Sequence, residues 1–279
     1  MTTHVSEVPF LRFADAHLAT GVRLRYAEQG DPAGPALVLL HGYSDSWYSW
    51  SGVLPLLPPH YHVFALDQRG HGDSDRPAAG YHLDDFAADV RAFMDAVGLA
   101  TATIVGHSLS SWVAQRAAAA APARVERLVL LGSSARTDFD AVRELDAVVQ
   151  ALPDPIPEEF IRAFQASTLH LPVADTFFER VVAESRKLPA HVWRSASAGW
   201  LTESRVADHT RIRMPTLIGW GDRDAVFLRE EQDALVAALP GAEFIVYPET
   251  GHALHWERPG RLARDLDRFL RATARASAA

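Results

Sequence analysis

The stretch TATIVGHSLSSW, residues 101–112, decides the fold class. Its first six residues are small or β-branched and end at a glycine, as in a buried strand, and an alanine-rich run with a helical pattern follows. Ser108 stands where the strand runs directly into the helix. A residue in such a turn adopts a strained backbone conformation and carries its side chain to the carboxyl end of the sheet. Ser108 is therefore a candidate nucleophile.

Strands and helices alternate along most of the chain. The segment 22–29 alternates polar and apolar residues like a half-buried strand, whereas the later strand segments are apolar almost throughout, as strands buried on both faces are. These later strands are predicted at 36–41, 62–67, 101–106, 125–132, 215–220 and 243–248. Helices are predicted at 84–97, 109–121, 230–239 and 258–274. The alternation predicts an α/β fold with a mostly parallel sheet flanked by helices.

The segment 136–211 interrupts this alternation because it contains no strand pattern. Its prolines cluster at 152–157, and its scattered aromatic residues favour a mostly helical insertion laid over the sheet. The chain is thus predicted to divide into a core domain of residues 1–135 and 212–279 and a helical cap of residues 136–211. Most aromatic residues of the cap are expected to form its own small core. A few are expected to face a cavity beneath the cap, and the candidates are Phe139, Phe164, Trp193 and Trp200.

Composition excludes several classes of protein. The 279 residues include no cysteine, which excludes disulfides, thiolate metal sites and a cysteine nucleophile. Lys187 is the only lysine, so a Schiff-base or P-loop lysine is excluded everywhere else. A net charge of −8 disfavours nucleic acid as the main partner and gives no attraction to anionic membranes. Histidines and carboxylates show no metal-site spacing, so neither a metal nor another cofactor is expected.

Patterns of membrane and export segments are absent from the sequence. No apolar run reaches the length of about eighteen residues that a membrane span needs. The segment MTTHVSEVPFLRF, residues 1–13, has no basic stretch followed by an apolar one, so no signal peptide is predicted. A cytoplasmic location is the default expectation, and the oligomeric state is left open.

A serine hydroxyl is a weak nucleophile and needs a base that is itself oriented by a third group. Candidates for both follow later strands. Asp222 and Asp224 lie just past the strand at 215–220, and His252 lies on a loop after the strand at 243–248. The chain order serine, acid, histidine is the order that this strand–turn–helix architecture uses.

Five motifs together resemble the α/β-hydrolase superfamily, over nearly the whole length of the chain. They are HGYSDS (41–46), DQRGHGDSD (67–75), GHSLS (106–110), GWGDRD (219–224) and GHALHWERP (251–259). The resemblance implies an eight-stranded, mostly parallel sheet with a helical lid inserted after the sixth strand. The aromatic-rich segment 136–211 falls in that place.

The resemblance also implies roles for individual residues. Ser108 matches the family nucleophile and His252 the general base. His255, three residues further on, is the alternative base, although its place before WERP is that of the start of the final helix.

The family acid usually stands three residues after the glycine of the seventh strand. Counted from Gly221, that residue is Asp224. Asp222 is the alternative, and it is expected instead to accept backbone hydrogen bonds in its own turn. Some relatives carry the acid after the sixth strand, but here no carboxylate occurs there before Asp138.

An oxyanion hole is implied by the resemblance as well. His41 and Gly42 match the family signature, so the backbone N–H groups of Tyr43 and Leu109 are expected to bind the oxyanion. The ring of Tyr43 is predicted either to line the pocket or to pack. His71 and His107 are expected to fill space or to form hydrogen bonds, and His107 is also a candidate pocket residue.

One position departs from the family pattern, because the turn around the nucleophile normally closes with glycine. Here that position is Ser110. Serine is small enough to be tolerated with a slight shift, so a functional turn is expected.

A serine nucleophile suits attack on a carbonyl carbon, whereas dehalogenases and epoxide hydrolases of this superfamily need a carboxylate. The expected activity is hydrolysis of a carboxylic ester or lactone of a small to medium apolar substrate through an acyl-serine intermediate. Perhydrolase or haloperoxidase-like chemistry, carbon–carbon bond hydrolysis and hydroxynitrile lysis use much the same residues and remain alternatives. A non-catalytic receptor for a small ligand is a further alternative from a different class.

Overall fold

The computed structural model describes residues 11–202 and 206–277. The first ten residues, which hold most of the segment on which no signal peptide is predicted, lie outside the described residues. Residues 203–205 of the predicted cap also lie outside them.

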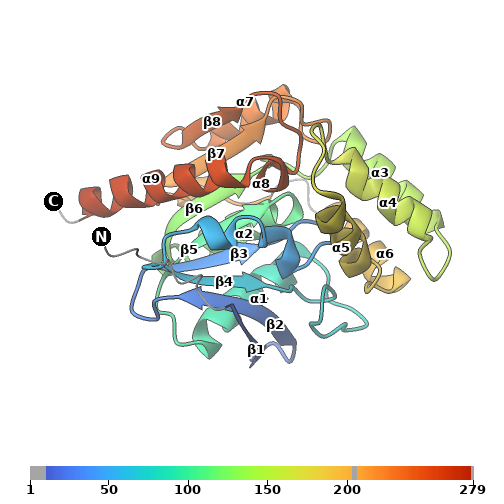
Figure 1. Ribbon diagram of the computed structural model, residues 1–279, viewed down its shortest axis with the longest axis horizontal. Coiled ribbons are helices and arrows are strands. Elements are labelled where there is room, and N and C mark those ends of the chain that lie inside the picture. Colours follow the sequence, from blue (N-terminus) through green and yellow to red (C-terminus); the bar gives the residue numbers. More distant parts are fainter. Residues whose placement is uncertain (1–10, 203–205, 278–279) are drawn as a thin grey trace, which may run out of the picture.

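Eight strands form one sheet in the order β1-β2-β4-β3-β5-β6-β7-β8 (Figure 1). The strands are β1 (Arg12–His17), β2 (Arg23–Gly30), β3 (Ala36–Leu40), β4 (His62–Leu66), β5 (Ala102–His107), β6 (Val125–Leu131), β7 (Thr216–Gly221) and β8 (Glu243–Tyr247). The pairs β1–β2 and β2–β4 are antiparallel. All pairings from β4 across to β8 are parallel. The predicted mostly parallel, eight-stranded sheet is confirmed.

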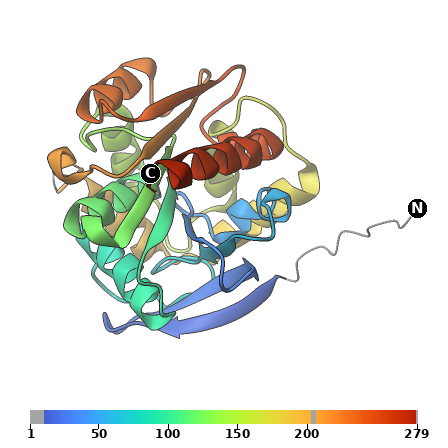
Figure 2. The same cartoon turned by 90° about the vertical axis from the view of Figure 1, so that its left-hand side faces the viewer.

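The central strands are covered on both faces, as their apolar sequences predict. Side chains alternate along a strand, so Val38 and Leu40 of β3 belong to one core cluster and Leu37 and Leu39 to the other. Helices α1 (Leu83–Ala96) and α2 (Leu109–Ala120) pack into the first cluster, and α9 (Pro259–Ser277) packs into the second. Figures 1 and 2 show these helices on the two faces of the sheet.

In the part of the chain that the structure describes, four α-helices lie between β6 and β7, and they are called the insertion helices below. They are α3 (Asp140–Ala151), α4 (Glu158–Ser167), α5 (Asp175–Ser185) and α6 (Ala190–Trp200). They lie together at one end of the molecule (Figure 1). The remaining elements are α7 (Arg229–Ala238), α8 (Leu254–Glu257) and the short 3-10 helices η1 (Trp47–Trp50), η2 (Leu54–Leu56), η3 (Pro122–Arg124) and η4 (His209–Arg211). The helix predicted at 258–274 corresponds to α9, and a separate short helix, α8, precedes it.

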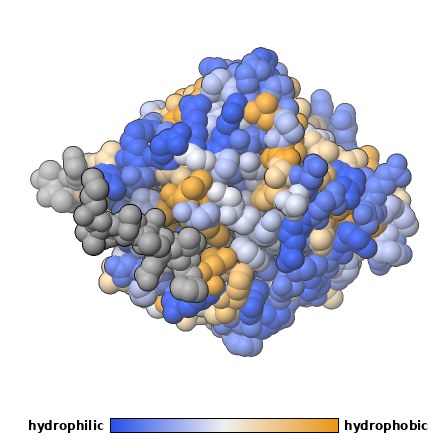
Figure 3. Space-filling model, viewed as in Figure 1, coloured by the Kyte–Doolittle hydropathy of each residue, from blue (hydrophilic) through white to orange (hydrophobic). Residues whose placement is uncertain are grey.

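The surface shows no single dominant apolar face in the view of Figure 3, where apolar residues form small patches among hydrophilic ones. The large apolar side chains that are most exposed come from separate parts of the chain: Phe13, Leu56, Val148 and Leu228. Among the helices that the structure describes, none combines the length and the apolar content needed to cross a membrane.

Candidate active site

Ser108 lies between β5 and α2, on the turn that its sequence predicts. Its backbone has φ 53° and ψ −124°, in a region that residues with a side chain rarely adopt, so the predicted strain is confirmed. The N–H of Ser108 donates a hydrogen bond of 3.0 Å to the carbonyl of Leu131. Gly106 makes the tight turn possible, since a Cβ at this position would lie 2.2 Å from the carbonyl oxygen of Ser110.

The structure brings Asp224 and His252 together. Nδ1 of His252 lies 2.9 Å from Oδ2 of Asp224, and both side chains are buried. The other carboxylate oxygen of Asp224 accepts hydrogen bonds from the N–H groups of Val226 at 2.8 Å and Phe227 at 2.9 Å. The carboxylate is therefore held in one orientation and faces a single ring nitrogen.

Asp222 does not have the role that the sequence predicts for it. Backbone hydrogen bonds in this turn go to Asp224 instead, and Oδ1 of Asp222 has no hydrogen-bond partner among the described residues. The nearest cation is the guanidinium of Arg223, at 3.8 Å. The turn after β7 therefore directs the carboxylate of Asp224, and not that of Asp222, toward the backbone N–H groups of the residues that follow.

The imidazole of His252 fits against a glycine. A Cβ at Gly132, whose φ is +51°, would lie 2.9 Å from Nδ1 and Cε1 of the ring. Ser108 and His252 line the same cavity, although no hydrogen bond joins their side chains in the described chain. Hydrogen bonds between a nucleophile and its base are commonly long without substrate and tighten when it binds.

The loop after β3 carries one candidate oxyanion donor, and the start of α2 carries the other. Neither Tyr43 nor Leu109 donates its backbone N–H to a turn, loop or cap partner among the described residues. Both residues line the cavity beside Ser108. Two N–H groups that converge next to a nucleophile form the arrangement that stabilises a developing oxyanion.

His41 is fixed by hydrogen bonds on both ring nitrogens. Nδ1 bonds to the carbonyl of Gly42 at 2.7 Å, so it carries the proton, and Nε2 accepts the backbone N–H of Gln68 at 3.1 Å. Burial, followed by the neighbouring ring of His71, lowers the pKa of His41 well below its ordinary value. A neutral His41 therefore anchors the loop that leads to Tyr43.

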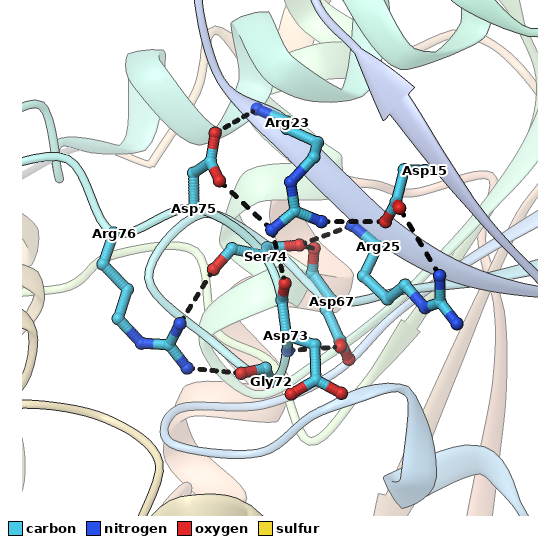
Figure 4. Close-up of polar contacts among 9 residues, drawn as sticks. All are labelled: Asp15, Arg23, Arg25, Asp67, Gly72, Asp73, Ser74, Asp75 and Arg76. Carbon is cyan, nitrogen blue, oxygen red and sulfur yellow. Dashed lines mark hydrogen bonds and ion pairs between the residues drawn. The ribbon is translucent and has the colours of Figure 1, made fainter.

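The loop of residues 67–76 holds Gln68 in place. The carboxylate of Asp67 accepts the N–H groups of Trp47 at 2.7 Å and Asp73 at 2.8 Å, and burial raises its pKa to about 7. A Cβ at Gly72 would overlap this carboxylate, at 2.1 Å. Figure 4 shows that the backbone N–H groups of Arg23 and Arg25 in β2 donate to Asp75 and Ser74 of the loop. It also shows Arg76 bonded to carbonyls within the loop, and Arg23 paired with Asp15 of β1.

The other histidines near the site are held as structural groups. Nε2 of His107 bonds to the carbonyl of His252 at 3.0 Å, and Nδ1 has no partner among the described residues. Nε2 of His255 bonds to the hydroxyl of Ser49 at 2.7 Å, and His255 does not line the cavity. Burial lowers the pKa of both rings, so both are neutral. His71 bonds to the carbonyl of Arg69 at 2.8 Å. Among the described residues, Nδ1 of His255 has no hydrogen-bond partner, whereas Nδ1 of His252 has Asp224.

The cavity has about 630 Å³ of empty space, counting the part that is open to solvent, and its wall is mainly apolar, with six aromatic side chains. Of the candidate pocket residues, His107, Phe164 and Trp200 line it. Phe139 instead packs behind the wall against Trp112 and Phe227, and Trp193 packs against Tyr43 and Phe160. Sequence reasoning missed these lining residues: Asp45, Trp112, Ala141, Val142, Leu145, Gln165, Ser167, Thr168, Val226, Phe227 and Trp256.

Asp45 is the most unusual of the missed residues, because it is a buried carboxyl group in the wall of the cavity. Burial raises its pKa to about 7. Its Oδ1 accepts a hydrogen bond of 3.0 Å from Nε2 of Gln165, a residue of α4 that also donates to the hydroxyls of Ser44 at 3.1 Å and Ser185 at 2.8 Å. Asp45 could have been found from the sequence, because it belongs to the HGYSDS motif. Its partner Gln165 could not, because it is 120 residues away and belongs to none of the motifs.

The described residues contain no group of three or more histidine, aspartate or glutamate side chains arranged to hold a metal ion. The site thus presents a serine hydroxyl, a histidine–carboxylate pair, and the backbone N–H groups of Tyr43 and Leu109 as candidate oxyanion donors beside one cavity.

Comparison with known proteins identifies the fold family. The family model for the alpha/beta hydrolase fold matches residues 35–259, which is most of the chain. The chain belongs to the α/β-hydrolase fold family and is an enzyme of the hydrolase class, as its sequence predicts.

Several relatives are similar over nearly their whole length. Epoxide hydrolase A of Mycobacterium tuberculosis is 29% identical over an aligned length of 312 residues, gaps included. The match covers 90% of this chain and 94% of that protein. The crystal structure of a hydrolase from Pseudomonas aeruginosa has a TM-score of 0.82 and 28% identity, and the match covers 93% of this chain and 98% of the other. A Burkholderia cenocepacia structure described as a "putative aryl esterase" has a TM-score of 0.83 and 25% identity, with coverage of 94% and 99%.

Proposed function

We propose that the protein is a serine hydrolase that cleaves a carboxylic ester or lactone of a small to medium apolar substrate through an acyl-serine intermediate. One observation carries the proposal: His252, which is paired with the buried Asp224 at 2.9 Å, lines the same cavity as Ser108 on its strained turn. The substrate is a small molecule, and neither nucleic acid nor a membrane is part of the proposal. The proposal also includes the cytoplasmic location that the sequence favours.

In the proposed mechanism, His252 accepts the proton of the Ser108 hydroxyl while the oxygen attacks the carbonyl carbon. The N–H groups of Tyr43 and Leu109 bind the oxyanion that forms. His252 then protonates the leaving alcohol, and an acyl-serine remains. Water activated by His252 releases the acid and restores Ser108. Throughout, Asp224 holds the proton on Nδ1 and stabilises the imidazolium.

The identity of the nucleophile separates this activity from that of the related epoxide hydrolase. Attack on an epoxide carbon by serine would form an ether, which water activated by histidine does not cleave. A carboxylate in the same place would form an alkyl ester, which water does cleave. With serine at position 108, the cycle closes only when the attacked carbon is a carbonyl carbon.

The insertion helices define the size of the proposed substrate. Residues 136–211 are proposed to act as a cap over the core domain of residues 1–135 and 212–279. Side chains from α3, α4 and α6 line the cavity together with Trp112 and Phe227 of the core. A wall that is mainly apolar, with six aromatic side chains, favours an apolar acyl or alcohol group, as in other small-molecule sites.

Steady-state hydrolysis of p-nitrophenyl acetate, butyrate and octanoate, with γ- and δ-lactones alongside, tests the proposal. Multiple turnovers are expected with the wild type and none above buffer with Ser108→Ala. A fluorophosphonate probe should add one label, and mass spectrometry should place it on Ser108. Ligand-induced thermal stabilisation without any turnover would contradict the proposal and indicate a receptor.

A further inference from the structure

Ser110 occupies the position at which the family's turn normally has glycine, and its hydroxyl forms a bridge. It donates a hydrogen bond to the carbonyl of His41 and accepts one of 2.6 Å from Nε2 of Gln68. The same Nε2 also donates to the carbonyl of His41, at 3.1 Å. Ser110, His41 and Gln68 are all buried. The hydroxyl, the amide and the carbonyl therefore form a closed set of hydrogen bonds away from water.

This bridge joins two segments just beyond the point where the sheet stops joining them. The last backbone pairing between β3 and β5 is that of Leu40 with Gly106. Beyond this pair, the segment after β3 continues to His41 and Tyr43, and the segment after β5 continues to Leu109 and Ser110. The two candidate oxyanion donors are thus attached to the two ends of the bridge.

We propose that Ser110 is a positioning residue, which holds the N–H groups of Tyr43 and Leu109 at the separation that the oxyanion requires. The inference rests on the proposed function, since only a reaction that develops an oxyanion needs this separation. Donors must lie about 2.7–3.1 Å from the oxyanion, and a displacement of about 1 Å is enough to lower a rate about 100-fold.

A hydroxyl at position 110 does what glycine or alanine does not. Gln68 is already anchored to His41 through its own backbone N–H and its amide. Without the hydroxyl, these bonds persist, but they connect only the loop of residues 67–76 to His41. The link to the start of α2 is lost, and the Gln68 amide loses an acceptor in a buried site.

The test compares Ser110→Ala and Ser110→Gly with the wild type on one p-nitrophenyl ester. Both variants are expected to lower kcat about 10- to 100-fold, with a much smaller change in KM, because the lost interaction acts in the transition state. Ser133→Ala is the matched control. Ser133 is buried, its hydroxyl accepts a hydrogen bond of 3.0 Å from Nε2 of Gln115, and it does not line the cavity, so its kcat is expected to stay at the wild-type level.

A second readout separates positioning from a general loss of structure. A trifluoromethyl ketone forms an oxyanion with the serine, whereas the product carboxylic acid does not. Affinity for the ketone is expected to fall in proportion to kcat/KM in both Ser110 variants, while affinity for the acid stays unchanged. Where Ser110→Ala fails to fold by circular dichroism, Ser110→Cys takes its place, because a thiol keeps a side chain there but is a weak donor and acceptor for the same two hydrogen bonds.

Three results would overturn the inference. In the first, both Ser110 variants keep kcat within about twofold of the wild type, a change too small to reflect a lost transition-state interaction. In the second, Ser110→Gly is fully active while Ser110→Ala is not, which would make position 110 a matter of space and not of hydrogen bonding. In the third, the wild type neither turns over an ester nor reacts with the fluorophosphonate, so that the proposed function itself fails before any variant is compared.

Discussion

The hydroxyl of Tyr43 donates a hydrogen bond of 2.6 Å to the backbone carbonyl of Trp193 in α6. Tyr43 belongs to the candidate oxyanion loop, and Trp193 belongs to the insertion, 150 residues further along the chain. The tyrosine ring also packs edge-on against Trp193 and Trp200, with ring centroids 4.9 and 4.5 Å apart. Tyr43 therefore lines the cavity and also joins the loop after β3 to the insertion helices, through one hydrogen bond and two ring contacts.

Tyr43→Phe tests this connection. The change keeps the ring and removes the hydroxyl, which leaves the buried carbonyl of Trp193 without this donor. An unsatisfied buried acceptor destabilises a protein by about 1–3 kcal/mol, so the free energy of unfolding measured in urea should fall by that amount. Tyr48→Phe is the control, since Tyr48 is half-buried and contacts the insertion by stacking its ring on Phe177, which the change preserves. An equal loss in both variants would contradict the special role of Tyr43.

Asp224 and Asp222 give a sharp pair of variants, because they differ in what they contact and not in chemistry. Asp224→Asn keeps the shape but no longer holds the proton on Nδ1 of His252, so kcat should fall by about 10⁴-fold. Asp222→Asn removes a partly exposed carboxylate that is 3.8 Å from Arg223 and should leave kcat within a fewfold of the wild type. Esterase kinetics on both proteins check the prediction. A larger loss in Asp222→Asn than in Asp224→Asn would reverse the assignment of the acid.

The sequence predicts the strands that are buried on both faces, because a short, continuously apolar run bounded by turn residues is typical of such a strand. It does not predict β1, where only Ala16 is buried and the other side chains are exposed or half-buried. An edge strand of this kind has no hydrophobic periodicity strong enough to stand out. Its pairing with β2 along the chain, from Arg12 with Glu28 to His17 with Arg23, comes from the sheet and not from local pattern.

Side-chain contacts between distant segments are the part that the sequence does not encode in any local pattern. The motifs single out Asp224 and His252, but which aspartate of the turn accepts backbone N–H groups depends on its backbone angles. The contact of Gln165 with Asp45 depends on how α4 packs on the loop after β3. Phe139 and Trp193 illustrate the same limit, since aromatic character alone does not tell the lining of a cavity from the layer behind it.

Asp45 should make stability depend on pH. Its pKa is raised from 3.8 to about 7 in the folded protein, because burial disfavours the charged form. The folded state thus holds this proton more tightly than the unfolded state. Below pH 4 the group is neutral in both states, and stability is lost as pH rises from about 4 through about 7. The carboxylate stays buried and charged above that range.

Asp45→Asn removes this titration and isolates its effect. The variant should gain stability relative to the wild type at pH 8, up to a limit of about 4 kcal/mol at about 1.4 kcal/mol per pKa unit, and the gain should shrink towards pH 4. Asp73→Asn is the control, because a hydrogen bond from Lys187 lowers the pKa of that carboxyl below 3.8, so it is charged in both the folded and the unfolded state between about pH 4 and 8. Urea unfolding across this pH range should therefore show a difference from the wild type that changes with pH for Asp45→Asn and stays constant for Asp73→Asn. A difference between Asp45→Asn and the wild type that does not vary with pH would contradict the buried charge.

Leu145 should set the length of the acyl chain that the cavity accepts. It lies on α3 and lines the cavity, whereas Val148, one turn further along the same helix, is 49% exposed and does not line it. Leu145→Phe adds a ring to the wall and should lower kcat/KM for p-nitrophenyl octanoate about tenfold or more, with little change for the acetate, because an overpacked pocket rejects the longer chain first. Val148→Phe makes a similar addition on the solvent side and should leave the ratio of the two substrates unchanged. A ratio that shifts equally in both variants would mean that α3 affects the site through its fold and not through the wall of the cavity.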